Sequence, residues 1–299
     1  MPELPEVETV RRGLARLIIG RQVASVTHDT PKSFPNAPDE VQQFVVGARI
    51  ADVRRRAKVL MIDFDSGHTL VTHLKMTGQL VWVQDTGQQI GADSRFGAGH
   101  PNDSLIGELP DRSTRVIMEF TDGSTLFFND QRKFGWMKLY PSVEVPFIDF
   151  MQKVGPEPLE DELTDDMFIE RLRRRNGTTV KAALLDQTVI AGVGNIYADE
   201  SLWGAKLHPA TRVREVSDDE LKLLLKELRF VLELAIEKGG STDRNYVNAE
   251  GKRGSYIDFA RVFRREGAAC PRHPEVIIEK LRVAGRGTHI CPVCQKEPV

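Results

Sequence analysis

The chain has 299 residues, of which 40% are hydrophobic and 28% charged, a composition typical of globular proteins and a length that suggests about two domains. No apolar run is long enough to span a membrane, and the acidic N-terminus differs from a signal peptide, so we expect a cytoplasmic protein. Three cysteines argue against a disulfide framework and leave a metal site open. The net charge of -2 excludes a uniformly basic protein, so binding to nucleic acid would require local basic patches.

A helix is predicted close to the start of the chain, over residues 5–19. Gly20 follows it as a C-terminal stop. The apolar side chains that recur at helical spacing on one face are Val7, Val10, Leu14 and Leu17. Packing this face into a core would fix the residues that precede the helix.

Those preceding residues include a proline at position two. Removal of Met1 would leave Pro2 with a free secondary amine, which can attack an aldehyde-level carbon and form a cationic iminium ion that withdraws electrons. Glu3 and Glu6 lie within one turn of this amine and could transfer protons. The ordinary alternative is that the proline and the two carboxylates only start a helix.

Short strands and turns are predicted between about residues 23 and 140. Two pairs of apolar segments, 58–64 with 69–74 and 116–120 with 124–128, flank glycine-containing turns and indicate hairpins. Several short strands with few helices favour a β-sandwich. Residues 84–112 lack periodicity and are rich in glycine, so we expect a long surface loop there.

The second half of the chain is predicted to be mainly helical, after a linker at residues 154–158. The segments with helical patterns or capping signals are 164–175, 179–186, 196–203 and 217–239, and a polar, glycine-rich loop follows at 239–256. Gly192 to Asn195 separates the two middle helices. Glycines there allow a partner to approach the backbone, and a helix start favours an anion, although such a segment is more often only a turn.

The C-terminal tail holds all three cysteines at spacings typical of a structural zinc site. Cys270 and His273 form one pair, and Cys291 and Cys294 form a second pair after seventeen intervening residues. Two turns that each carry two ligands suit one tetrahedral ion, so we predict a zinc ribbon with three cysteines and one histidine. The alternative is that His273 is a surface residue. His289 is a weaker candidate because it lies on a predicted strand and points off the turn.

Two distant segments resemble one protein family. The opening MPELPEVETVRRGL and the later LLDQTVIAGVGNIYADESLWGAKLHP are similar to the corresponding segments of bacterial formamidopyrimidine-DNA glycosylases. The resemblance implies an α+β protein with three parts and DNA in a cleft. The expected parts are a catalytic β-sandwich with the N-terminal helix (1–153), a helical helix–two-turn–helix domain (154–255) and a zinc-finger β-ribbon (256–299).

The resemblance also implies roles for individual residues. Pro2 is the expected nucleophile, Glu3 moves protons at the sugar, and Glu6 supports Glu3 and the amine. The residue expected to bind phosphate beside the lesion in the catalytic site is Lys58. Further phosphate contacts are expected from Asn195 and Arg286, and the side chains expected to fill the space left by a flipped nucleotide are Met76, Arg132 and Phe134.

The implied activity is that of a bifunctional DNA glycosylase and abasic-site lyase. It would remove 8-oxoguanine and formamidopyrimidines from duplex DNA and cut the strand by β,δ-elimination, as a monomer with one structural zinc ion. The alternatives are an enzyme resembling endonuclease VIII, which prefers oxidised pyrimidines, a DNA-binding paralogue without catalysis, and an N-terminal-proline tautomerase. Three features depart from the family pattern: His273 replaces a cysteine, Lys75 replaces a glycine, and the 84–112 segment is longer.

Overall fold

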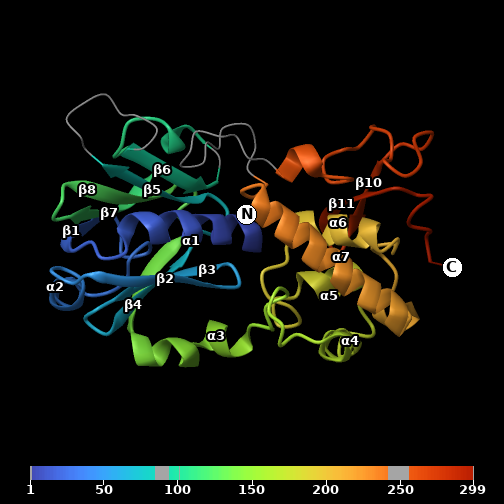
Figure 1. The fold of residues 1–299 in the computed structure, drawn as a ribbon, viewed down its shortest axis with the longest axis horizontal. Helices are drawn as coiled ribbons and strands as arrows, with labels where there is room; N and C mark the ends of the chain where they lie inside the picture. Colours follow the sequence, from blue (N-terminus) through green and yellow to red (C-terminus); the bar gives the residue numbers. More distant parts are fainter. Residues whose placement is uncertain (1, 85–93, 101, 242–255, 299) are drawn as a thin grey trace. The chain divides into compact units, whose positions relative to one another are not determined.

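The computed structural model describes residues 2–84, 94–100, 102–241 and 256–298 (Figure 1). The described residues form two compact units, one of residues 2–152 with 238–241 and one of residues 153–237 with 256–298. The domain limits after residues 153 and 255 stay predictions. Among the described helices, none is long and apolar enough to cross a membrane.

The first unit contains two antiparallel sheets that face each other. The five-stranded sheet has the order β1 (Val23–His28), β7 (Thr114–Phe120), β8 (Ser124–Asp130), β5 (Gly78–Gln84) and β6 (Arg95–Gly99). The four-stranded sheet has the order β2 (Ile50–Arg56), β3 (Val59–Phe64), β4 (His68–His73) and β9 (Trp136–Pro141). Alternating apolar residues from both sheets share one buried core, as predicted for a sandwich.

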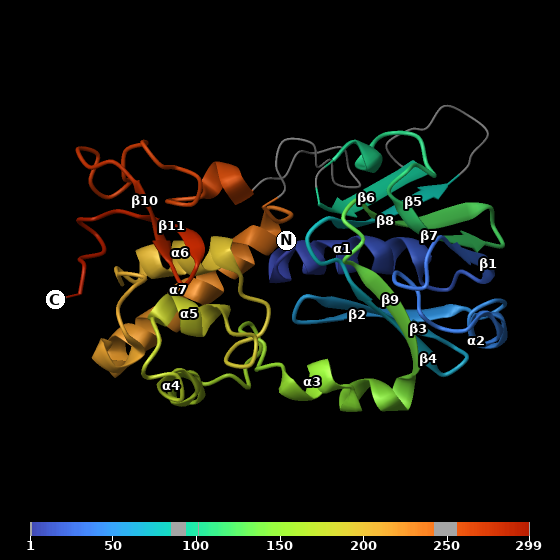
Figure 2. The ribbon, with the colours of Figure 1, turned by 180° about the vertical axis from the view of Figure 1, so that it is seen from behind.

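Helix α1 (Leu4–Ile18) lies along this sandwich between the two sheets, as both views show (Figures 1 and 2). Val7, Val10 and Leu14 are fully buried in the common core, and Leu17 packs against it. Gly20, with a positive φ of 83°, follows the helix at the predicted stop. The predicted helix is therefore confirmed, shifted by one residue at each end.

The expectation of a surface loop over residues 84–112 is wrong for its described second half. Residues 95–99 form the edge strand β6, and Phe96 is only 3% exposed because its ring packs on Gly13 of α1. A Cβ at Gly13 would lie 2.0 Å from the Phe96 Cζ, so the close packing requires glycine. Glycines at alternate positions of β6 hid its apolar pattern from the sequence analysis. Residues 85–93 lie outside the described residues.

Short helical segments complete the first unit. They are α2 (Pro38–Phe44), η2 (Asp103–Leu105), η3 (Ser142–Phe147) and, ending in the linker region, α3 (Asp149–Lys153). A smaller apolar cluster joins Val145 of η3 to the outer face of β3 and β4. The four-stranded sheet is therefore covered on part of its outer face as well.

The second unit is helical and ends in a two-stranded ribbon. Its elements are α4 (Asp165–Arg173), α5 (Val180–Leu185), α6 (Asn195–Gly204), η4 (Val213–Glu215), α7 (Asp218–Glu237), η5 (Tyr256–Phe259), β10 (Glu279–Val283) and β11 (Arg286–Ile290). Thr164 and Thr179 cap α4 and α5 through their side chains, and Ser217 forms a reciprocal capping pair with Glu220 at the start of α7. All four predicted helices are confirmed, three of them with these caps, whereas α6 follows Gly194 without a side-chain cap.

Candidate functional site

The N-terminal residues are held in place at the start of α1. Pro2, Glu3 and Glu6 are buried, and Glu6 uses its Oε2 to accept a hydrogen bond of 2.7 Å from the Glu3 backbone N–H. The Oε1 of Glu6 accepts from the backbone N–H of Ser241 at 2.7 Å. The Glu6 carboxylate therefore joins two separate chain segments and fixes the position of the residue next to Pro2.

Lys58 lies in the turn between β2 and β3 and is 6% exposed. The preceding residue, Ala57, has a φ of +53°, which tightens this turn. Glu8 of α1 connects the helix to the turn, because it pairs with Arg55 at 3.2 Å and Arg55 donates to the Ala57 carbonyl at 3.0 Å. The first turns of α1 and the Lys58 turn are thus fixed to each other by charged hydrogen bonds.

His73, at the end of β4, lies near Lys58, and the sequence analysis assigned it no role. Burial, together with the positive charges of Lys75 and Lys58, lowers its pKa to about 3. The neutral ring accepts a hydrogen bond of 3.0 Å from the Lys75 backbone N–H through Nδ1. A histidine at a strand end between two lysines was the signal that could have identified it.

Two short loops carry Met76, Arg132 and Phe134 at the same end of the sandwich. The first loop leads from β4 to β5 and the second from β8 to β9, so each crosses from one sheet to the other. The register pairs His73 with Trp136 and Gly78 with Asp130, which places the two loops beside each other. The structure therefore brings these three predicted residues together.

The crossover loops, residues 74–77 and 131–135, each expose one large apolar side chain. Met76 is 41% exposed and Phe134 is 48% exposed. The Phe134 ring has the Lys32 Nζ at 5.2 Å and the Arg132 Cζ at 5.1 Å from its centroid. Large apolar side chains beside cations on a protein surface suit a polyanionic partner that also offers flat apolar rings.

Lys75, which stands where the family pattern has glycine, has a backbone conformation that favours glycine. Lys75 adopts a φ of +52°, in the left-handed region that favours glycine. Lys133, in the other crossover loop, also has a positive φ, of 56°. Each loop therefore carries one lysine in a conformation that costs a side chain about 1–2 kcal/mol.

In the second unit, Asn195 and Arg286 lie together. Asn195 is the first residue of α6, and its Nδ2 donates a hydrogen bond of 2.9 Å to the Gly287 carbonyl. Arg286 is exposed at the start of β11, after a two-residue turn in which Ala284 and Gly285 both have positive φ. A helix N-terminus and a guanidinium at the tip of a hairpin are both suited to a phosphate.

A buried ion pair, which the sequence analysis missed, supports this arrangement. Lys181 of α5 and Asp199 of α6 are both 0% exposed, and the Lys181 Nζ lies 2.6 Å from the Asp199 Oδ1. The same Nζ donates to the Thr288 Oγ1 at 2.7 Å, next to Gly287. A lysine inside the apolar helix Val-Lys-Ala-Ala-Leu-Leu was the available signal, because a buried charge requires a partner.

Asp199 also determines the place of His289. The Asp199 Oδ2 accepts from the His289 backbone N–H at 3.0 Å and lies 3.3 Å from its Nδ1. The His289 ring therefore faces the helices and takes no part in the cysteine cluster, in agreement with its low rank as a ligand. The pair of Lys181 and Asp199 therefore connects α5 and α6 to β11, the strand that begins at Arg286.

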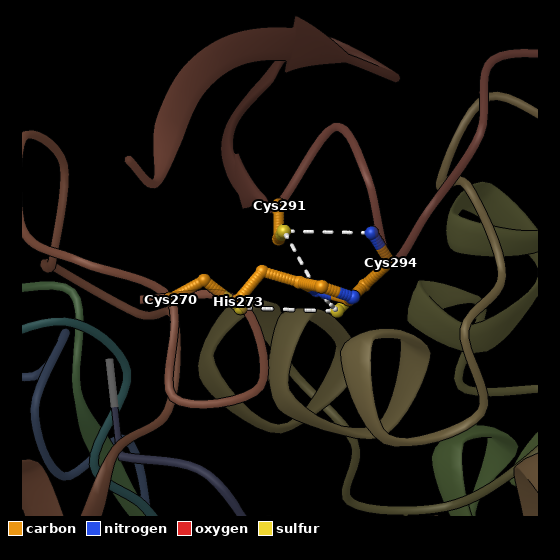
Figure 3. Close-up of side chains that lie close together, drawn as sticks. All are labelled: Cys270, His273, Cys291 and Cys294. Carbon is orange, nitrogen blue, oxygen red and sulfur yellow. Dashed lines mark hydrogen bonds between the residues drawn. The ribbon is translucent and has the colours of Figure 1, made fainter. Parts of the chain in front are cut away.

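The four residues of the predicted zinc site converge. Cys270, His273, Cys291 and Cys294 present ligand atoms that all lie within 4.8 Å of one another (Figure 3). The Sγ atoms of Cys270 and Cys294 are 3.8 Å apart, and the His273 Nδ1 is 3.2 Å from the Cys294 Sγ. Tetrahedral zinc with bonds of about 2.3 Å separates two sulfurs by about 3.8 Å, so the donor set fits one structural zinc ion.

The environment of the cluster is also suited to a metal. Burial would raise the pKa of the Cys270 thiol, but backbone N–H groups of Arg272 and His273 bring it down to about 6. Arg272 stacks on Trp203 at 3.8 Å from the ring centroid and donates to the Trp203 carbonyl at 2.8 Å. The first ligand turn is therefore anchored to the C-terminal end of α6.

Family models match most of the chain. Residues 1–137 match the formamidopyrimidine-DNA glycosylase N-terminal domain, residues 154–246 match the H2TH domain of the same family, and residues 276–296 match the zinc finger found in FPG and IleRS. The last match contains Cys291 and Cys294 but begins after Cys270 and His273. The first ligand pair is thus supported by the geometry alone.

Full-length relatives and solved structures agree with these models. Formamidopyrimidine-DNA glycosylase from Streptococcus pyogenes serotype M6 is 40% identical over 99% of both chains, and that from Herpetosiphon aurantiacus is 41% identical over 99% of this chain and all of its own. The Lactococcus lactis Fpg in complex with abasic-site DNA is 32% identical with a TM-score of 0.84 over 99% of this chain and 100% of its own. The complex of the same wild-type protein with N7-benzyl-Fapy-dG-containing DNA gives a TM-score of 0.84 at 32% identity and the same coverage. This chain belongs to the formamidopyrimidine-DNA glycosylase family.

Proposed function

We propose that this protein is a DNA glycosylase that removes oxidised purines from duplex DNA and then cleaves the strand as an abasic-site lyase. The observation that carries the proposal is the fixed start of α1, where the Glu6 carboxylate holds the residue next to Pro2, in a chain that aligns over 99% of its length with named glycosylases. The complexes of the Lactococcus lactis relative with abasic-site and N7-benzyl-Fapy-dG DNA support the substrate class.

The proposed chemistry begins after loss of Met1. The Pro2 nitrogen forms a bond to C1′ of the damaged nucleotide as the glycosidic bond breaks and the base leaves with its electron pair and a proton. Glu3 is the group proposed to move protons at the sugar, with Glu6 as its support. Opening of the sugar gives an iminium ion, which acidifies the C2′ hydrogen, so that β-elimination breaks the C3′–O bond and δ-elimination breaks the C5′–O bond. Water then releases the sugar fragment from Pro2.

The proposed DNA contacts come from both units. Lys58, Asn195 and Arg286 contact phosphates, which positions the duplex without reading its sequence. Met76, Arg132 and Phe134 fill the space left when the damaged nucleotide rotates out of the stack. Their exposure on adjacent crossover loops supports this role, because buried core residues could not insert into DNA.

Zinc has a structural role in this proposal. Cys270, His273, Cys291 and Cys294 would hold the ion, which supplies folding free energy to a ribbon that has a small apolar core. The bacterial relatives, whose DNA lies in the cytoplasm, support a cytoplasmic location.

Reduction with borohydride tests the function directly. Wild-type protein mixed with a duplex that contains one 8-oxoguanine opposite cytosine should give a covalent protein–DNA product, and Pro2→Gly should lose most of it. A lesion panel with oxidised purines and pyrimidines defines the preference. Full strand cleavage by Pro2→Gly, or cleavage of the undamaged duplex at the same rate, would contradict the proposal.

A further inference from the structure

The two crossover loops are fastened to one carboxylate. Asp130, the last residue of β8, is 0% exposed and lies at the base of the loop that carries Phe134. Its Oδ2 accepts backbone N–H bonds from Phe134 at 2.8 Å and Gly135 at 2.6 Å. Its Oδ1 accepts from the Arg132 backbone N–H at 3.2 Å. One side chain therefore fixes three backbone N–H groups of the second loop.

The same carboxylate reaches the first loop through Thr77. The Thr77 hydroxyl donates to the Asp130 Oδ1 and accepts a hydrogen bond of 3.1 Å from the Arg132 backbone N–H. Thr77 is 8% exposed, whereas its neighbour Met76 is 41% exposed. The hydroxyl is thus a buried link between the loop of Met76 and the loop of Arg132 and Phe134.

Packing around the carboxylate leaves the second loop little room to move. A Cβ at Gly135 would lie 2.7 Å from the Phe128 Cζ and 3.1 Å from the Asp130 Oδ2. The backbone of the loop therefore sits directly on the carboxylate and on a core ring. Charge-assisted hydrogen bonds in a buried setting are strong and directional, so they define one loop conformation.

We propose that Asp130 is a positioning residue that holds Met76, Arg132 and Phe134 as one preformed unit for insertion into DNA. The inference rests on the proposed function. A preformed unit matters most when a paired base must be displaced, because unpairing and unstacking cost free energy that insertion has to offset. An abasic site has no base to displace. Asp130 should therefore be needed for excision of a paired lesion and much less for cleavage of an abasic site.

Asp130→Asn tests this separation. Asparagine keeps the shape but replaces one acceptor oxygen by an NH₂ group, which faces the N–H donors of the loop. Single-turnover excision of 8-oxoguanine opposite cytosine should slow by roughly 10- to 100-fold, as expected for misplacement of positioning groups. The rate of cleavage of a duplex with a preformed abasic site should stay within about threefold of the wild-type rate. The fluorescence rise of 2-aminopurine beside the lesion, which reports unstacking, should slow in parallel with excision.

Variants of Thr77 test the same link between the two loops without changing the Asp130 carboxylate. Thr77→Val removes the hydroxyl link at nearly constant volume, and Thr77→Ser keeps it. Valine should reproduce the selective loss, and serine should restore most of the excision rate. If Asp130→Asn fails to fold, this pair decides the question.

Asp122→Asn is the matched control. Asp122 lies at the opposite end of β8 and accepts from the Ser124 backbone N–H at 3.0 Å and its hydroxyl at 2.7 Å, away from both loops. Asp122→Asn should leave the ratio of the 8-oxoguanine excision rate to the abasic-site cleavage rate at its wild-type value.

Two outcomes would overturn the inference. An equal fall of both rates in Asp130→Asn and Thr77→Val would assign Asp130 to general stability, and unchanged rates would show that the link is not needed. Failure of wild-type protein to cleave either duplex would instead refute the proposed function and the inference with it.

Discussion

The crossover loops of the first unit and the β10–β11 hairpin of the second unit hold the side chains proposed to contact DNA by different means. The loops depend on hydrogen bonds to the buried Asp130 and the half-buried His73, beside an extensive apolar core. The hairpin has a core of only a few apolar residues and depends on a buried ion pair and a four-ligand metal site. A short ribbon cannot bury enough apolar surface to fix its tip, so it requires stronger single interactions.

The largest effect should come from loss of zinc. Cys291→Ser should remove the ion and unfold the ribbon, because structural zinc contributes about 10–16 kcal/mol in zinc-finger peptides. Affinity for lesion-containing duplex should fall by at least roughly 100-fold, which equals about 2.8 kcal/mol. Amide hydrogen exchange should become fast in residues 276–296 and stay slow in β3 and β8.

His273→Cys is the control for zinc, since cysteine is an equally good ligand. It should retain one zinc ion per chain and wild-type affinity. Slow exchange in a Cys291→Ser protein that has lost its zinc would show that the ribbon does not depend on the metal, and the contrast between the two regions would disappear.

The next largest effect concerns the buried ion pair. Lys181→Met leaves Asp199 buried without its cation, which should lower the free energy of unfolding by about 3–5 kcal/mol. Adding Asp199→Asn removes the uncompensated charge but keeps an acceptor for the His289 N–H, so the double variant should regain much of the loss. Chemical denaturation of the three variants measures the coupling. Additive losses would contradict a direct pairing.

A pH effect on stability should arise from His73 in the first unit. The pKa of His73 is lowered from 6.5 to about 3, so between these values the unfolded chain binds a proton that the folded chain does not. Stability is therefore full well above pH 6.5 and falls as the pH decreases toward 3, with a slope of at most about 1.4 kcal/mol per pH unit. His73→Asn keeps a hydrogen-bond acceptor but does not titrate, so its stability should fall less steeply in urea titrations. Identical slopes for the two proteins would refute the assignment.

The smallest effect should come from Lys75. Its positive φ predicts that Lys75→Gly stabilises the protein by up to about 1 kcal/mol, and that Lys75→Val destabilises it by more than that, because a β-branched residue is less tolerant of this region. Urea denaturation measures both changes. A destabilising Lys75→Gly would indicate that contacts of the lysine side chain outweigh the backbone strain.

The sequence predicted the helices, the two hairpins and the ligand set because each depends on local signals. Helix α7 has a capping pair and a regular apolar face, and the zinc ligands occupy two short turns. The strand β6 was missed because Gly97 and Gly99 interrupt its alternation. The roles of Asp130 and Lys181 could not be predicted, since their partners are distant in the chain: Thr77 is 53 residues from Asp130, and Thr288 is 107 residues from Lys181.

The proposed chemistry depends on a covalent bond between the Pro2 nitrogen and the damaged nucleotide. The most direct test is to trap the 8-oxoguanine duplex with borohydride, digest the product and determine by mass spectrometry which peptide carries the sugar remnant. One modified peptide is expected, which begins at Pro2 without Met1 and carries the added mass on the proline nitrogen. A remnant on Lys58, or on another lysine, or an active protein that retains Met1, would contradict it.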